Sequence, residues 1–189
     1  PISAGTLAEF IAYLRGNPAK LNYGSPGNGS SPHLAGEMFN RAAKVRTTHV
    51  PYKGAAPALT DLLAGQLDFM FDPGIGLQHA KSGKLKLLAV GSPKRHPAYP
   101  DVPTVAETLP GFEAISWFGM LAPAKTPREI ITRLNRDFIR ALSQPEVREK
   151  ITGMGLDVDT TTPEEFGAFL EGESDRFGRV LRQYKITAD

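Results

Sequence analysis

The sequence predicts an α/β fold in which helices flank a mainly parallel sheet. Four short extended segments, rich in apolar and β-branched residues, alternate with helical segments of about ten residues. Glycine, proline and asparagine mark most of the boundaries between them. Such alternation is typical of right-handed βαβ units around a parallel sheet. The predicted strands are a short one that begins at Leu21 and three over residues 46–52, 67–71 and 85–90.

The composition is that of an ordinary globular protein. The 189 residues are 41% hydrophobic, which is enough for one core or for two small lobes. The net charge of +2 comes from interspersed basic and acidic residues, so neither nucleic acid nor an anionic membrane is an expected partner. The absence of cysteine excludes disulfides and zinc thiolate sites, and it fits either the cytosol or an oxidising periplasm. No apolar run is long enough for a transmembrane helix, and no charged-then-apolar leader precedes Pro1, so we expect any secretion signal to be missing from this chain.

Capping residues and apolar periodicity predict the helices of the first half. Thr6 and Glu9 form a capping box for an amphipathic helix that ends at Gly16. Ser31, followed by Pro32, is the expected N-cap of the next helix. Three further helices are predicted over residues 57–65, over residues 75–82, and in a short stretch capped by Thr104 and Glu107.

The second half of the chain departs from this alternation. Residues 113–122 are predicted to form a long strand that connects one lobe to another. Two helices are then predicted to begin with the same capping motif, at residues 126–129 and 162–165. The motif is an N-cap threonine, a proline at the first helical position and a capping-box glutamate. Each helix has one apolar face, formed by Ile130, Ile131, Leu134, Phe138 and Leu142 in the first and by Phe166, Phe169, Leu170, Phe177 and Leu181 in the second.

The loop between the first strand and the second helix carries the strongest functional signal. It spans Ser25 to Ser31 and contains Gly27 and Gly29, with Gly24 directly before it. These glycines let the backbone turn sharply and approach a ligand, and the helix that follows presents unpaired N–H groups and the positive end of its dipole. Such a corner binds phosphate or carboxylate without a charged side chain. A plainer interpretation, a tight connection that caps its own helix, stays open.

The order of residues in this loop argues against nucleotides. A Walker loop ends in Gly-Lys-Ser/Thr, whereas Gly29 is followed by Ser30 and Ser31. The glycines run G-x-x-G-x-G, the reverse of the dinucleotide fingerprint, and no acidic residue lies at the ribose distance. A carboxylate is therefore the expected anion.

Two other predicted strand ends place polar groups at the same edge of the sheet. Tyr52 and Lys53 follow one strand, and Asp72 follows the next. Lys53 would balance a ligand carboxylate and Tyr52 would supply a hydroxyl or a flat wall, although a solvated lysine and a half-buried aromatic are the plainer interpretations. Asp72 either caps the following helix or faces the ligand. In the second case it favours a ligand that also carries an amine, amide or hydroxyl group.

The residue types of a hydrolytic triad are present without its motif. With His33 and Asp72, any of the three loop serines would complete the set, so a small α/β serine hydrolase is an alternative. No G-x-S-x-G elbow is present, however, and a histidine in the first turn of a helix is biased towards neutrality. The other histidines share no metal-ligand spacing: His49, His79 and His96.

Five motifs in this order resemble the receptors of tripartite tricarboxylate transporters, the Bug family. They are YGSPGNGSSPHL at residues 23–34, HVPYKG at 49–54, DLLAGQ at 61–66, PDVPTVAE at 100–107 and WFGMLAP at 117–123. The resemblance implies a periplasmic-binding-protein-like (type II) fold with two lobes that close on a small carboxylate, and transfer of the ligand to membrane permease subunits. A sensory binding module that engages a membrane signalling protein would use the same fold, so transport and sensing both stay open.

The resemblance also assigns the lobes. It implies that residues 1–112 form the ligand-binding second lobe and that residues 113–189 are a connecting strand and helices of an incomplete first lobe. The family's Pro-x-Gly-Gly segment has no counterpart here, so the chain resembles an N-terminally truncated receptor. Apolar faces left without partners are then expected to pair with another copy of the chain.

The expected site combines the loop with the two strand ends. Asp72 matches a position near the ligand in some family members, although Pro73-Gly74 after it departs from the common pattern and leaves the choice of ligand open. Ser30 and Ser31 are the best candidates for direct contacts. We expect no catalytic residue, metal or cofactor, and the expected ligand-binding residues are Ser25, Gly27, Asn28, Gly29, Ser30, Ser31, His33, Tyr52, Lys53 and Asp72.

Overall fold

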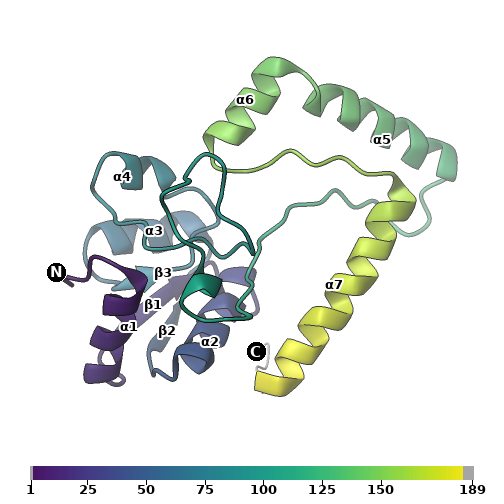
Figure 1. Cartoon of the computed structure of the whole chain (residues 1–189). Coiled ribbons are helices and arrows are strands. Elements are labelled where there is room, and N and C mark those ends of the chain that lie inside the picture. Colours follow the sequence, from purple (N-terminus) through teal and green to yellow (C-terminus); the bar gives the residue numbers. More distant parts are fainter. Residues whose placement is uncertain (1, 185–189) are drawn as a thin grey trace. The chain divides into compact units, whose positions relative to one another are not determined.

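The structure of the chain, a computed structural model, describes residues 2–184 and divides them into two compact units between Ser116 and Trp117. The first unit contains α1 (Leu7–Gly16), β1 (Asn22–Ser25), α2 (Ser31–Ala43), β2 (Thr48–Pro51), α3 (Ala55–Leu63), β3 (Phe69–Met70), α4 (Leu77–Lys81) and the 3₁₀ turn η1 (Val105–Glu107). The second contains α5 (Arg128–Leu142), α6 (Pro145–Gly153) and α7 (Pro163–Tyr184) (Figure 1). Within residues 2–184, no helix combines the length and the apolar character needed to cross a bilayer.

The three strands of the first unit form a parallel sheet in the order β2-β1-β3. Tyr23 of β1 lies opposite His49 of β2 and Phe69 of β3. Helix α2 connects β1 to β2 and α3 connects β2 to β3, so each crossover is helical, as parallel neighbours require. This confirms the predicted α/β class and places the carboxyl ends of all three strands at one edge.

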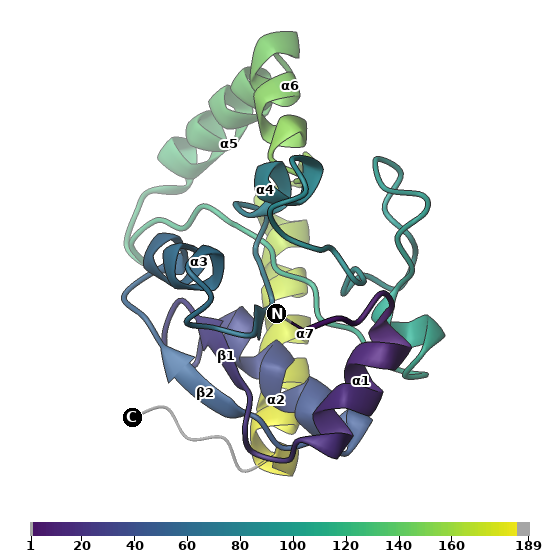
Figure 2. The same ribbon diagram turned by 90° about the vertical axis from the view of Figure 1, so that its left-hand side faces the viewer.

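Helices α2 and α3 cover opposite faces of this sheet. The ring of Tyr23 lies directly against Gly36 of α2, with no room for a side chain at Gly36. On the neighbouring residue Gly24, a Cβ atom would meet Leu67 and lie 3.5 Å from Ala58 of α3. Since successive residues of a strand face opposite sides, these contacts set α2 on one face and α3 on the other (Figure 2).

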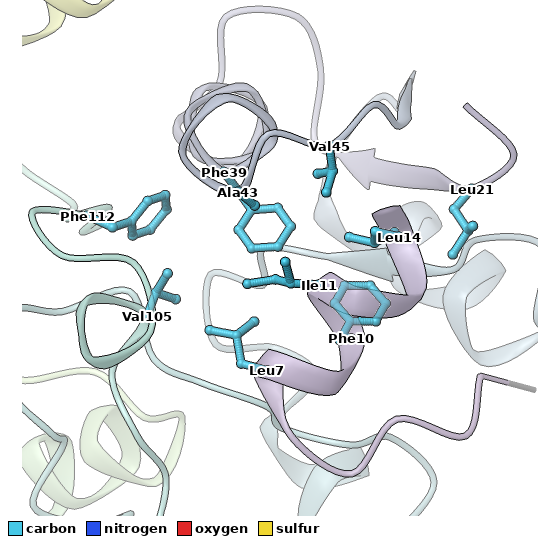
Figure 3. Packing of buried hydrophobic residues seen from close by; sticks show 10 residues of the cluster. All are labelled: Leu7, Phe10, Ile11, Leu14, Leu21, Phe39, Ala43, Val45, Val105 and Phe112. Carbon is cyan, nitrogen blue, oxygen red and sulfur yellow. The ribbon is translucent and has the colours of Figure 1, made fainter. Parts of the chain in front are cut away.

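The main core lies on the α2 side, where α1 adds a further layer. The buried side chains of α1 are Leu7, Phe10, Ile11 and Leu14, and they pack with Phe39 and Ala43 of α2 (Figure 3). Phe69 of β3 joins them through edge-to-face contacts with Phe10 and Phe39, at ring-centroid distances of 5.2 Å and 6.0 Å. The periodicity predicted for α1 therefore produces one apolar face, and that face anchors α2 against the sheet.

Two capping boxes of the first unit form as predicted, and one cap is displaced. Thr6 and Glu9 satisfy each other's backbone N–H groups at α1, and Thr104 and Glu107 do the same at η1. At α2 the N-cap is Ser30 and not Ser31, because the hydroxyl of Ser30 accepts the N–H of His33. The predicted start of α3, at residue 57, lies two residues after the observed start at residue 55.

The fourth predicted strand, over residues 85–90, does not form. Val90 makes only an isolated bridge to Thr104, in which its N–H donates to Pro103 and its carbonyl accepts from Val105. The backbone of this segment pairs with the chain near η1 and not with a strand of the sheet. Its apolar composition is instead explained by packing, because Leu88 and Ala89 contact the core.

The predicted strand over residues 113–122, which crosses the boundary between the two units, is irregular. In the second unit an unpredicted helix, α6, follows α5. Trp117 packs edge to face on Phe166 and Phe169 of α7, and its indole N–H donates to Glu173. These contacts explain an aromatic run without a strand. The predicted capping box of residues 162–165 forms at α7. That of residues 126–129 does not, because α5 begins at Arg128 without a side-chain cap.

The apolar face predicted on α5 exists but is exposed. The exposed fractions are 40% for Ile130, 42% for Leu134 and 40% for Phe138, and no residue of α5 is buried. The preceding segment is more exposed still, with 75% for Phe118 and 76% for Leu121. The second unit therefore carries apolar surface that its described residues do not cover.

We expect the substitution Gly36→Ala to destabilise the first unit, because a methyl group would overlap the Tyr23 ring and push α2 away from β1. The expected loss is about 1–3 kcal/mol in the free energy of unfolding, despite the higher helix propensity of alanine. Gly16→Ala is the matched control, because no atom lies within 4 Å of its added Cβ. Urea unfolding measures both, and equal midpoints for the two variants would contradict this packing.

Candidate functional site

The loop from Ser25 to Ser31 joins the carboxyl end of β1 to the N-terminus of α2. It turns through Gly27 and Gly29, whose φ angles of 145° and 74° are strained for other residues. The hydroxyl of Ser30 donates to the carbonyl of Gly27 at 2.7 Å and accepts the N–H of His33 at 3.4 Å. One serine therefore both closes the loop and caps the helix.

Ser31 is the first helical residue, and it is the polar group that the loop leaves available. Neither its N–H nor its hydroxyl has a hydrogen-bond partner within residues 2–184, and its side chain is half-buried. The first N–H groups of a helix have no intrahelical partner and carry the positive end of the dipole. This corner is therefore suited to an anion that brings its own acceptor oxygens.

Ser25 stabilises the loop through buried hydrogen bonds. Its side chain is fully buried, and its hydroxyl accepts the N–H of Gly27 at 3.1 Å and lies 3.0 Å from the carbonyl of Gly27. The same oxygen lies 2.6 Å from Nε2 of His49 on β2. Ser25 is thus a support of the loop and does not face solvent, although the sequence predicted it as a ligand contact.

His33 is also turned inward. It is buried, and its Nδ1 accepts the N–H of Gly29 at 3.0 Å. Its ring stacks on the ring of His49, with centroids 3.9 Å apart and an angle of 7° between the planes. His49 in turn stacks on Tyr23 at 4.9 Å, and the hydroxyl of Tyr23 donates to Glu37 at 2.8 Å.

Three residues that support the loop were not predicted as part of the site: the buried Tyr23 and the half-buried His49 and Glu37. The strand register sets Tyr23 opposite His49, and Glu37 joins them from α2. Burial, and to a lesser extent the adjacent His33, lowers the pKa of His49 to about 4. Burial, together with the hydrogen bond to Glu37, raises the pKa of Tyr23 well above its usual range.

Tyr52 and Lys53 have different roles at the neighbouring strand end. The N–H of Tyr52 donates to the carbonyl of Ser25 at 2.9 Å, and its hydroxyl donates to Asp61 at 2.7 Å. The bond to Asp61 raises the pKa of the Tyr52 hydroxyl. Lys53 is exposed, and it has no ion pair or side-chain hydrogen bond within the described part of the chain. Lys53 is therefore an exposed cation at this edge of the sheet.

Asp72 caps a turn and not a helix. Its Oδ2 accepts the N–H groups of Gly74 and Gly76, each at 2.9 Å, while the N-cap of α4 is Gly76. The residue is exposed overall, but its carboxyl group is folded onto this turn. Desolvation raises the pKa of Asp72, and the two backbone hydrogen bonds oppose this rise.

The arrangement does not favour hydrolysis or metal binding. The serine that contacts a histidine, Ser25, is fully buried, and the Oδ2 of Asp72 is occupied by backbone amides. Within residues 2–184 no three histidine or acidic side chains come together to hold a metal ion. What the loop offers chemically is hydrogen-bond donation to an anion.

Because the pKa of His49 is about 4 in the folded chain, against 6.5 for an unperturbed histidine, the unfolded chain binds the proton first as the pH falls. The folded state should therefore lose stability from about pH 6.5 to pH 4, on the order of 2 kcal/mol from this group. We expect His49→Gln to reduce this loss, whereas the control His79→Gln keeps it. Urea unfolding at a series of pH values checks the prediction, and unchanged pH slopes in His49→Gln would contradict it.

Several relatives of this chain are known. It is 36% identical to the "UPF0065 protein in tcbD-tcbE intergenic region" of Pseudomonas sp. strain P51, over 97% of this chain and 55% of that protein. It is 34% identical to a UPF0065 protein of Pseudomonas knackmussii, over 86% of this chain and 98% of the relative. Identity to BugT of Bordetella pertussis is also 34%, over 94% of this chain and 55% of BugT. The chain thus spans about half the length of two of these relatives.

The chain also resembles solved structures, two of which contain a carboxylate. Rpa4515 of R. palustris, solved with adipate, superimposes with a TM-score of 0.93 at 34% identity, over 98% of this chain and 63% of that one. The periplasmic binding protein BugD has a TM-score of 0.93 at 32% identity, over 100% and 64%. MatC from Rhodopseudomonas palustris, solved with malate, has a TM-score of 0.85 at 34% identity, over 94% and 62%.

The profile of the family "Tripartite tricarboxylate transporter family receptor" matches residues 1–186, which is nearly the whole chain. That family consists of transporter receptors, and BugD is described as a periplasmic binding protein, so the hydrolase alternative is not supported. The motifs, the parallel sheet with its loop at the carboxyl edge and the profile agree, and the chain belongs to the tripartite tricarboxylate transporter receptor family.

Proposed function

We propose that this chain is the carboxylate-binding part of a periplasmic receptor. The observation that carries the proposal is Ser31, whose N–H and hydroxyl stand without partners, within the described residues, at the N-terminus of a 13-residue helix. Two ligand oxygens would accept from these donors, while the glycines let the anion approach the backbone. Relatives of similar fold were solved with adipate and malate, which supports a dicarboxylate as the ligand.

The neighbouring strand ends would complete recognition. Lys53 is free to follow the second carboxylate of the ligand, and as a long exposed side chain it would add charge without fixing geometry. Asp72 would favour a ligand that offers a hydroxyl, amine or amide group, because a bare carboxylate beside it would be repelled. A hydroxylated dicarboxylate therefore suits this edge better than a plain one.

We assign residues 1–112 to the ligand-binding lobe and residues 113–189 to part of the other lobe. Closure of two lobes on the ligand would replace its water and would present a changed surface to permease subunits in the membrane. The structural relatives described as periplasmic support the same compartment for this chain. A chain that holds one side of the site should bind more weakly than a full clamshell.

We expect the chain to bind malate or adipate in isothermal titration calorimetry, and Ser31→Ala to weaken that binding about tenfold, because a hydrogen bond to a charged ligand is lost. Ser30→Ala should weaken binding and also cost about 1 kcal/mol of stability, since it removes the cap of α2.

Thr6→Ala is the matched control for the loss of a cap, because it removes the N-cap of α1 away from the loop. It should cost similar stability and leave the dissociation constant unchanged. If Ser31→Ala binds both acids as tightly as the unaltered chain, the loop is not the carboxylate site.

We also propose that the chain self-associates through its second unit. The exposed apolar residues of α5 and of the segment before it are not covered by the described residues of the second unit, and the same face on a second copy of the chain would supply a complementary apolar surface. An isologous dimer would bury the α5 faces against each other.

Sedimentation velocity should therefore show a concentration-dependent dimer. We expect Phe138→Glu to shift the chain to monomer, because it places a charge in the apolar face. Thr132→Glu, an exposed polar position of the same helix, should leave the dimer intact. A monomer at every concentration tested would refute self-association.

A further inference from the structure

We propose that His33 and His49 act together as positioning residues, holding the Ser25–Ser31 loop in the shape that receives the carboxylate. The inference rests on the proposed function, because it names the groups that prepare the same site. Neither histidine would touch the ligand. Their effect on affinity would pass through the backbone of the loop.

Each ring holds one end of the loop. At the first end, Nε2 of His49 lies 2.6 Å from the hydroxyl of Ser25, which also bonds to both backbone groups of Gly27. At the other end, Nδ1 of His33 accepts the N–H of Gly29 at 3.0 Å. Residues 26–28 therefore lie between two side-chain anchors, one at Ser25 and one at Gly29.

The two anchors are also fixed to each other. The centroids of the two histidine rings lie 3.9 Å apart, with an angle of 7° between the planes. The ring of Tyr23 stacks on that of His49, with centroids 4.9 Å apart. Tyr23 is fully buried and its hydroxyl is held by Glu37. The stack thus draws residues from β1, β2 and α2, and it links the loop to the packed sheet instead of leaving it on a flexible hinge.

The proton positions explain why histidine suits these places. Nδ1 of His33 accepts an N–H, so it carries no proton, and a neutral ring leaves its proton on Nε2. A flat neutral ring can stack and accept at the same time, which an aliphatic side chain cannot do. The N–H of Gly29 would otherwise turn outward, and the path of the backbone into Ser30 and Ser31 would change.

Matched pairs of variants separate the effect of the histidine hydrogen bonds from the effect of side-chain volume. Asn places an acceptor oxygen near the position of Nδ1, and Gln places its amide NH₂ donor near that of Nε2. His33→Asn and His49→Gln therefore keep the hydrogen bonds, whereas His33→Leu and His49→Leu remove them. Titration of the 189-residue chain with malate and adipate should show about tenfold weaker binding for each Leu variant. The Asn and Gln variants should stay within about threefold of the unaltered chain. Leu variants that bind normally, or Asn and Gln variants that lose as much as Leu, would overturn the inference.

A second readout needs no ligand and keeps the two proposals distinguishable. Amide hydrogen exchange followed by NMR should show a protected Gly29 N–H in the unaltered chain and in His33→Asn, and faster exchange in His33→Leu. If the chain binds neither acid but this pattern holds, the proposed function fails and the positioning role of His33 stands. If Gly29 exchanges equally fast in all three proteins, the positioning role fails whatever the binding result. Circular dichroism melts identify any variant that does not fold. If a Leu variant does not fold, the binding and the hydrogen exchange of the Asn and Gln variants test the inference.

Discussion

The contact between Tyr23 and Gly36 is the constraint on which the rest of the first unit depends. Tyr23 is fully buried, and its ring occupies the space where a side chain of Gly36 would lie. Helix α2 can therefore approach β1 closely, and the chain needs only the residues between Ser25 and Ser31 to pass from one to the other. A short, turned connection directs the N-terminus of α2 to the carboxyl edge of the sheet. There its unpaired N–H groups meet the end of the central strand.

Local signals predicted the capping boxes of α1, η1 and α7, and the displaced cap of α2 shows their limit. Thr6 and Glu9 form a box because cap and partner are three residues apart and need nothing else. Ser30 and Ser31 have the same side chain, and the sequence-based prediction placed the N-cap one residue late, at Ser31. The backbone decides, because the positive φ of Gly29 turns the chain so that the Ser30 hydroxyl faces the N–H of His33. The serine that is left over, Ser31, is the one with free donors.

Features that depend on distant pairing were not predictable. In the sequence, His49 was considered only as a metal ligand. It stacks between His33 and Tyr23 because of the strand register that sets it opposite Tyr23. Residues 85–90 have the composition of a strand, but a strand also needs a neighbour, and only Val90 finds one, at Thr104. Trp117 likewise packs on the aromatic side chains of α7 instead of joining a sheet. The apolar composition of these segments reflects side-chain packing, and it was interpreted as the pairing of a strand within a sheet.

Recognition of an anion by uncharged donors suits a receptor that must release its ligand. A buried arginine or lysine at the loop would hold a carboxylate strongly but would cost several kcal/mol of desolvation whenever the site stood empty. The N–H and hydroxyl of Ser31 carry no net charge, so the open site is not penalised in this way. The charged groups lie at the margin: water screens the exposed Lys53, and the N–H groups of Gly74 and Gly76 hold the carboxylate of Asp72. Affinity would then depend on how far water is excluded, so closure would strengthen the hydrogen bonds and opening would weaken them.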